Sequence, residues 1–157
     1  MQIVPLSDEN LFIYKNLCQP YEAEFSPLTD KSPDKDGLFL IESIPNGSSC
    51  VGYLLKEGET PLGFAIATIG KEYNDVSEFY IVPKFRKKKL GYKLAKHLFD
   101  THPGTWHIRQ IEGADHAVAF WRRVLDRYVD GCYTQSCVHD KRWGMVTRQV
   151  FATKGTA

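Results

Sequence analysis

The sequence lacks an excess of charge of either sign, a long apolar run and the leader of a secreted protein. Its 157 residues carry 20 Lys and Arg against 19 Asp and Glu, a formal net charge of +1. Bulk charge therefore does not favour binding to nucleic acid. No apolar stretch approaches the roughly 20 residues that a membrane helix needs, and the first residues, MQIVPLSDEN, lack the pattern of a signal peptide. We expect a cytoplasmic protein with no nucleic-acid or membrane partner.

The sequence also lacks a cysteine framework. Cys18, Cys50, Cys132 and Cys137 are scattered, and their spacing favours neither one disulfide pairing nor a structural zinc site. We expect four free cysteines, buried as small apolar side chains in a reducing compartment, and no metal. Hydrophobic residues make up 43% and charged residues 25% of the chain, which is typical of a globular protein. The length predicts a single domain over residues 1–157 with its own core.

Alternating apolar patterns predict a mixed α/β (α+β) domain built on one sheet. Expected strands cover residues 2–6, 38–43, 50–56, 62–69, 76–82 and 105–111, with a closing antiparallel pair within 136–153. Expected helices run from Ser7 to Pro20 and over 91–102 and 115–128. Residues 21–37 contain two prolines and Gly37, which indicates an irregular exposed connection, and one short helix within it stays open. A connection of that length is usually functional.

The chemistry is concentrated in residues 76–95, VSEFYIVPKFRKKKLGYKLA. The predicted strand ends at Pro83, and Gly91 opens the next helix. Six of the ten residues from 84 to 93 are Lys or Arg. A basic loop that leads into a helix N-terminus offers free backbone amides and the positive end of the helix dipole, which suits phosphates. Charge alone does not distinguish a phosphate site from a solvated basic face or a nucleic-acid-binding patch. A nucleic-acid-binding patch usually has aromatic side chains among its basic residues, and here only Phe85 and Tyr92 lie among them.

The same stretch resembles a known family. EFYIVPKFRKKKLGYKLAKHLF is similar to the acetyl-CoA-binding segment of the GNAT superfamily of N-acetyltransferases, Arg/Gln-x-x-Gly-x-Gly/Ala. Arg86 and Gly91 occupy the outer positions, and Lys89 stands where the first glycine is usual; we expect ordinary backbone dihedrals there. The resemblance to small bacterial GNAT proteins covers residues 62–134. Downstream, ADHAVAFWRRVL is similar to the family's Asn-x-x-Ala-x-x-Phe/Leu-Tyr, with alanine for the asparagine and Trp121 for the tyrosine.

The resemblance implies a fold, a co-substrate and a binding site. The fold would be a mostly antiparallel sheet with helices on both faces and splayed fourth and fifth strands. The reaction would be direct transfer of an acetyl group from acetyl-CoA to a primary amine. Amides of Tyr80, Ile81 and Val82 would bind the pantetheine and polarise the thioester. The diphosphate would rest on the backbone of Arg86, Lys87, Lys88, Lys89, Leu90, Gly91 and Tyr92, with Phe120 and Trp121 beside the pantetheine.

Glu78 is the predicted base, because the family places a glutamate on this strand. Alternation in a strand puts Val76, Tyr80 and Val82 on its face, so partial desolvation would raise the carboxyl pKa toward neutrality. The alternative is an edge glutamate paired with a lysine. An indole cannot supply a proton as the family's tyrosine does, and we therefore expect Tyr128 as the acid, with Tyr133, His116 or water as alternatives.

The acceptor site is predicted from the resemblance at Tyr21, Glu22, Glu24 and Phe25. Carboxylates among aromatic side chains suit a cationic amine such as a polyamine, an aminoglycoside or a lysine side chain; an ordinary acidic loop is the alternative. Two other functions stay open. The replaced glycine, asparagine and tyrosine are compatible with a non-catalytic acyl-CoA-binding module, and residues 84–93 with a nucleic-acid-binding domain. The sequence is also compatible with a homodimer.

Overall fold

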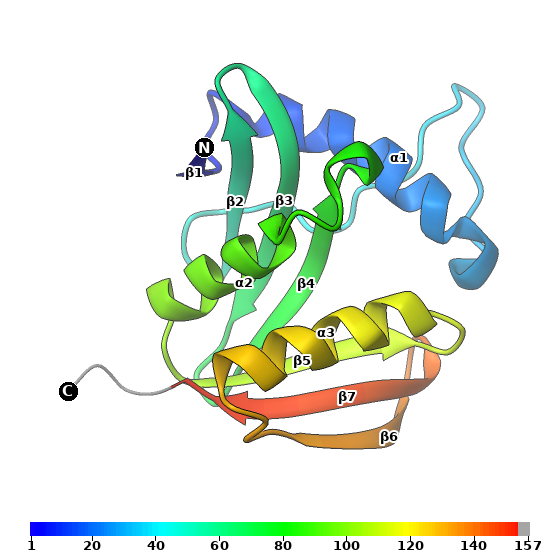
Figure 1. Cartoon of the computed structure of the whole chain (residues 1–157). Coiled ribbons are helices and arrows are strands. Elements are labelled where there is room, and N and C mark those ends of the chain that lie inside the picture. The colour runs from blue at the N-terminus through cyan, green and yellow to red at the C-terminus, as the bar shows by residue number, and fades with distance from the viewer. Residues whose placement is uncertain (154–157) are drawn as a thin grey trace.

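Within residues 1–153, which the computed structural model describes, one seven-stranded sheet organises the chain in the order β1-β2-β3-β4-β5-β7-β6 (Figure 1). The strands are β1 (Gln2–Pro5), β2 (Cys50–Glu57), β3 (Thr60–Ile69), β4 (Asn74–Ile81), β5 (Thr105–Ile111), β6 (Thr134–Asp140) and β7 (Gly144–Ala152). The helices are α1 (Leu11–Thr29), α2 (Leu90–Thr101) and α3 (Asp115–Tyr128), with a short 3-10 turn, η1 (Pro83–Phe85). The end of the predicted domain, residues 154–157, lies outside the described residues. None of the described helices has the length and apolar character needed to cross a bilayer.

Strands β4 and β5 diverge. They are the parallel pair in an otherwise antiparallel sheet, and they pair only at Asn74–Trp106 and Asp75–His107. Beyond these residues β4 follows β3, whereas β5 follows β7, and Figure 1 shows the two strands separating. The predicted mixed sheet with splayed fourth and fifth strands is therefore confirmed. The separation exposes one edge of β4 in the middle of the molecule.

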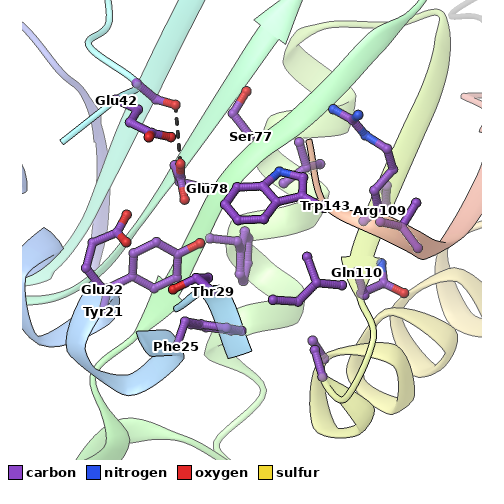
Figure 2. Close-up of a pocket in the computed structure, with 18 of the residues that line it drawn as sticks. Tyr21, Glu22, Phe25, Thr29, Glu42, Ser77, Glu78, Arg109, Gln110 and Trp143 are labelled. Carbon is purple, nitrogen blue, oxygen red and sulfur yellow. Dashed lines mark hydrogen bonds between the residues drawn. The ribbon is translucent and has the colours of Figure 1, made fainter. Parts of the chain in front are cut away.

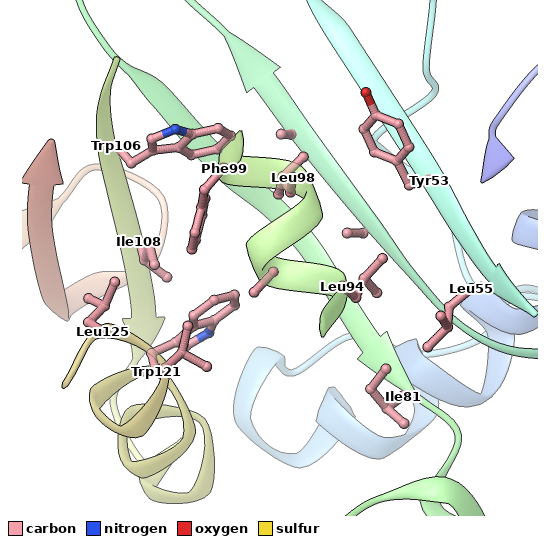
Figure 3. Close-up of a cluster of buried hydrophobic side chains, with 14 of the residues drawn as sticks. Tyr53, Leu55, Ile81, Leu94, Leu98, Phe99, Trp106, Ile108, Trp121 and Leu125 are labelled. Atoms are coloured by element: carbon pink, nitrogen blue, oxygen red, sulfur yellow. The ribbon is translucent and has the colours of Figure 1, made fainter. Parts of the chain in front are cut away.

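Helices cover both faces of the sheet, as predicted. On one face, α1 places Tyr14 against Phe64 of β3, with ring centroids 4.8 Å apart. On the other face, α2 and α3 bury Leu98, Phe99 and Trp121 in the larger core (Figure 3). The amphipathic spacing of apolar residues in these two helices accounts for their burial.

Helix α1 is longer than the sequence predicts. It continues through Pro20 and Pro27 to Thr29, although proline lacks the N–H that a helix interior uses. The hydroxyl of Ser26 donates a hydrogen bond of 2.7 Å to the carbonyl of Ala23, the group that Pro27 leaves without its usual partner. The prediction that the helix ends at Pro20 is therefore wrong, and the helical part of the predicted 21–37 connection is the continuation of α1. Residues 38–43, predicted as a strand, have no regular structure.

A β-bulge at Ser77 changes which side chains share a face of β4. Glu78 pairs with Ile66, but the adjacent Ala67 pairs with Val76, which leaves Ser77 as an extra residue. Because one extra residue reverses the alternation, Val76 packs on the α2–α3 side. The prediction that Val76 lies on the same face as Glu78 is therefore wrong.

Two of the cysteines differ from expectation. Cys18 is buried and Cys50 half-buried, but Cys132 and Cys137 are exposed. Cys132 lies in the turn after α3, and Cys137 lies on the edge strand β6, where no element covers it. All four are free, and residues 1–153 contain no group of His, Cys, Asp or Glu arranged to hold a metal.

Candidate active site

The space between the diverging strands is a pocket of about 380 Å³ (Figure 2). Its floor is β4 and β5, and its walls come from α1, the loop before β2, the first half of α3 and the β6–β7 turn. Its ionisable and aromatic lining includes Tyr21, Glu22, Phe25, Lys31, Glu42, Glu78, Phe79, Arg109, Trp121, Arg142 and Trp143. The pocket thus brings together predicted site residues from α1, β4 and α3.

Glu78 lies in this pocket with its carboxylate only partly exposed. The hydroxyl of Ser43 donates a hydrogen bond of 3.3 Å to its Oε1 (Figure 2). Burial is the largest influence and raises the pKa of Glu78 above its usual range, against the lowering effect of the Tyr21 hydroxyl. No Lys or Arg within residues 1–153 forms an ion pair with Glu78. A desolvated carboxylate without a cation is suited to accept a proton.

Tyr21 lies directly beside this carboxylate. Figure 2 shows the two side chains directed toward each other. Burial, and then the negative charge of Glu78, raise the pKa of Tyr21 well above its usual range, so the phenol stays neutral and can donate a hydrogen bond. Its ring packs edge-to-face on Phe25 and Phe64, with centroids 5.3 and 5.5 Å away. The sequence predicts Tyr21 as an acceptor contact, and the structure also makes it the neighbour of the predicted base.

An ion network covers the side of the pocket away from the sheet. The Lys31 ammonium lies 3.1 Å from the buried Glu22 carboxylate and 3.6 Å from that of Glu42, which also pairs with Arg142. Lys31 and Arg142 both lie over the Trp143 ring, at 5.6 and 4.5 Å from its centroid. Sequence reasoning missed all of these residues except Glu22, because they come from three segments that only the fold brings together.

Glu24 does not line the pocket. Both oxygens of its carboxylate accept hydrogen bonds of 2.8 Å from the guanidinium of Arg86, whose Nε donates to the carbonyl of Ile81 at 2.8 Å. Since residues 21–29 are helical, Glu24 points to roughly the opposite side of α1 from Glu22. The structure therefore does not bring Glu24 to the pocket with the other predicted acceptor residues, and its ion pair joins α1 to the basic loop.

The exposed edge of β4 presents fewer amides than predicted. The N–H of Val82 donates to the carbonyl of Leu62 at 2.9 Å, so it is not available to a ligand. In an antiparallel pair, alternate residues face the partner strand, which directs the N–H of Tyr80 to β3 and those of Phe79 and Ile81 to the open edge. Of the three predicted amides, the structure therefore leaves that of Ile81 facing the splay.

The basic loop forms a cradle of free amides at the start of α2. Arg86 donates its N–H to Pro83 at 3.2 Å, whereas the amides of residues 87–92 find no backbone acceptor within the described chain. Lys87 and Lys89 have positive φ values of 66° and 62°. The expectation of ordinary dihedrals at Lys89 is therefore wrong: it keeps the left-handed conformation that favours glycine. Free amides at a helix N-terminus form an anion-binding site.

An apolar wall connects the cradle to the pocket. A Cβ atom on Gly91 would lie 2.7 Å from the Phe120 ring, so only glycine allows α2 and α3 to approach this closely. Phe79 of β4 lies 5.5 Å from Phe120 and 4.8 Å from Trp121 between ring centroids. Trp121 is 5% exposed and lines the pocket. The predicted positions of Phe120 and Trp121 beside the pantetheine of acetyl-CoA are compatible with this wall.

The remaining loop side chains pack locally. Leu90 and Tyr92 contact the main core, and the Arg127 guanidinium lies 4.1 Å from the centroid of the Tyr92 ring. The Lys88 ammonium lies 5.9 Å from the Phe85 ring. Among these groups, the backbone amides and the Lys88 ammonium, which forms no ion pair with a described residue, are therefore free to bind an anion.

Tyr128 is not brought to the pocket. It is the last residue of α3, whereas the pocket meets the first half of that helix. Its hydroxyl donates a hydrogen bond of 2.7 Å to Asp100, and its ring packs on Phe99 and Phe151. Burial, followed by the bond to Asp100, raises its pKa. These contacts give Tyr128 a packing role in the main core.

Comparisons with known proteins agree with this geometry. The chain resembles the structures of the ribosomal-protein-S18-alanine N-acetyltransferase from Escherichia coli (11% identity, TM-score 0.63, covering 99% of this chain and 96% of that chain) and of NAA60 from Arabidopsis thaliana in complex with acetyl-CoA (12%, 0.65, 98% and 99%). It also resembles a chimera of the spermidine N-acetyltransferase SpeG from Vibrio cholerae and hSSAT (11%, 0.64, 97% and 96%). At these identities the likeness shows the fold alone. A comparison with curated proteins found no match.

The sequence itself matches a family model. The model describes the acetyltransferase (GNAT) family and matches residues 11–126, which include α1, the diverging part of β4 and β5, the basic loop and most of α3. The match spans the larger part of the chain and contains Glu78 together with the amide cradle. The protein is therefore a member of the GNAT acetyltransferase family.

Proposed function

We propose that the protein is an N-acetyltransferase that transfers an acetyl group from acetyl-CoA directly to a primary amine. The observation that carries the proposal is the splay between β4 and β5. Its pocket holds the partly buried Glu78 carboxylate, which has no ion pair with a described residue, and free backbone amides lie at the start of α2. Family membership supports the same reaction class, as does the bound acetyl-CoA of the Arabidopsis neighbour.

Acetyl-CoA fits the residues present. The diphosphate would accept hydrogen bonds from the amides of residues 87–92, helped by the positive end of α2 and by Lys88 and Lys93. The pantetheine would follow the open edge of β4, where the Ile81 amide faces the splay. Phe120 and Trp121 would cover it on the α3 side. Arg86 would act through its ion pair with Glu24, which holds the loop against α1.

The pocket residues then account for the transfer. Glu78 accepts a proton from the acceptor ammonium, directly or through a water molecule, and the neutral amine attacks the thioester carbon. A C–N bond forms, and the Ile81 amide stabilises the negative oxygen of the tetrahedral intermediate. The C–S bond then breaks. The second amine proton reaches the leaving thiolate, directly or through water, and gives the amide and coenzyme A; Tyr128 has no part in this scheme.

The first test is binding and turnover. Acetyl-CoA at 100 times its dissociation constant should stabilise the fold by about 2.7 kcal/mol, seen as a rise in melting temperature. A panel of primary amines is then assayed for free thiol release. Glu78→Gln should lower kcat/KM by about 100-fold or more, the range of a general base, without changing the acetyl-CoA-induced shift.

The matched control is Glu59→Gln, which makes the same change at an exposed glutamate in the β2–β3 turn. It should leave turnover unchanged. Full activity in Glu78→Gln would overturn the base assignment. Tight acetyl-CoA binding without thiol release for any amine would instead indicate the non-catalytic acyl-CoA-binding module.

A further inference from the structure

The charges in the pocket are almost completely balanced. Three carboxylates line it, those of Glu22, Glu42 and Glu78. Lys31 pairs with the first two, and Arg142 pairs with Glu42 as well. Glu78 has no ion pair with any described residue. Among the described residues, Glu78 is therefore the one pocket carboxylate outside an ion pair, and it is the proposed base.

The remaining cation of the pocket is balanced too. The guanidinium of Arg109 lies 2.7 Å from a carboxylate oxygen of Asp75 and 2.8 Å from one of Asp140. These bonds direct its charge toward β4 and the β6–β7 turn. Every described cation that lines the pocket thus has a carboxylate partner, so residues 1–153 leave no unpaired positive charge there for an acidic acceptor.

Much of the uncharged lining is apolar and aromatic, and the polar side chains of Thr29, Ser43, Ser77 and Gln110 complete it. Tyr21 and Phe25 form one wall with their rings 5.3 Å apart, Phe79 and Trp121 form another at 4.8 Å, and the Trp143 indole also lines the pocket (Figure 2). Such surfaces bind rings and alkyl groups by burial and stacking. A second ammonium would lose its hydration there without gaining a free carboxylate, and it would lie near Lys31 and Arg142.

We propose that the acceptor is an amine with a single positive charge on an apolar, ring-bearing body, and not a polycation. The inference rests on the proposed function, since it assigns the ammonium to Glu78 as the group that is deprotonated. It replaces the sequence-based expectation of an acidic wall for polyamines, because Lys31 neutralises Glu22 and because Glu24 lies outside the pocket. A small arylalkylamine and the N-terminus of a peptide that begins with an aromatic residue share this chemistry.

The test compares acceptors at saturating acetyl-CoA. The probes are 2-phenylethylamine, a short peptide with an N-terminal phenylalanine, and spermidine. We expect kcat/KM for the better of the two aromatic probes to exceed that for spermidine by at least tenfold. The better probe shows whether the acceptor is a small arylalkylamine or a peptide N-terminus. A wild-type preference for spermidine would overturn the inference while leaving the proposed transferase intact. Absence of turnover with every amine would instead overturn the proposed function.

A charge-release variant makes the test specific. Lys31→Met frees Glu22 and removes one of the two cations that pair with Glu42, so spermidine should gain at least tenfold relative to the aromatic probe. The variant Lys31→Met/Glu22→Gln/Glu42→Gln removes the freed charges and should abolish this gain. A folded Lys31→Met protein with an unchanged ratio would overturn the inference.

Since Lys31→Met leaves Glu22 buried without its cation, folding is checked by melting temperature with and without acetyl-CoA. Arg142→Gln is the second variant, because the Arg142 side chain is 53% exposed and its loss leaves no buried charge. It weakens the compensation of Glu42 only, so the preference should move toward spermidine by a few-fold. Movement toward the aromatic probe would contradict the charge argument.

Discussion

The left-handed conformation of Lys89 makes a direct prediction about stability. Lys89 immediately precedes α2 with φ 62° and ψ 12°, a region that a residue with a Cβ enters at a free-energy cost. Lys89→Gly should therefore stabilise the fold, even though glycine in most positions does the opposite. The variant also restores the residue that the family pattern has at this place.

The magnitude follows from two opposing effects. The left-handed conformation costs a residue with a Cβ roughly 1–2 kcal/mol, which glycine does not incur. Glycine in turn loses about 0.5–1 kcal/mol more in backbone entropy on folding than alanine does. The difference is a gain of about 0–1.5 kcal/mol in the free energy of unfolding, centred on ~0.8 kcal/mol. For a chain of this length, 1 kcal/mol corresponds to roughly 2–4 °C in melting temperature.

The assay is thermal or urea unfolding of wild type, Lys89→Gly and Lys89→Ala. Alanine removes the same ammonium but keeps the Cβ, so it should give no gain and serves as the control for charge. Lys88→Gly is the second control, since Lys88 is not among the residues with positive φ, and it should not stabilise. A melting temperature of Lys89→Gly at or below that of Lys89→Ala would refute the strained-loop interpretation.

Three further predictions concern charge. The raised pKa of Glu78 predicts that kcat/KM rises with pH through an acid limb above the usual glutamate range of about 4.3, and that Glu78→Gln removes this limb. Burial raises the pKa of Asp75 from 3.8 to about 6, against the lowering effect of Arg109, so the folded state binds this proton more tightly than the unfolded state. Its contribution to stability is therefore present at low pH and lost as the pH rises from about 4 to 6, a slope that Asp75→Asn should remove from urea unfolding curves. Reversing two loop charges, Lys88→Glu/Lys93→Glu, should weaken acetyl-CoA binding by about tenfold at low salt and leave acceptor KM nearly unchanged, as calorimetry and steady-state kinetics can show.

Each of these three predictions has a control variant or a result that would contradict it. An unchanged acid limb in Glu78→Gln would assign that titration to another group. A stability curve of Asp75→Asn that keeps the wild-type slope would place the proton elsewhere. For the loop charges, Lys15→Glu/Lys35→Glu makes the same net change at exposed positions away from the cradle, and an equal loss of acetyl-CoA affinity in both double variants would exclude a local phosphate contact.

The sequence alone determined the parts of this protein that depend on local patterns. The β2–β3 hairpin, the amphipathic α2 and α3, and the basic strand-to-helix loop were predicted because hydrophobic period, proline and glycine act within a few residues. The family resemblance placed Glu78 on the central strand, and the pocket contains it. These features are independent of what packs against them, so a single sequence was sufficient.

The tertiary structure decided what depends on distant partners. Pro20 lies inside α1 because packing of Tyr14 and Cys18 on the sheet outweighs a local helix-breaking signal. The bulge at Ser77 moved Val76 to the other face, which no alternation rule could anticipate. Backbone strain at Lys89 is tolerated because β4 and α2 hold both ends of the loop. The balance of charge in the pocket, finally, depends on side chains up to 100 positions apart, and only the folded chain brings them into contact.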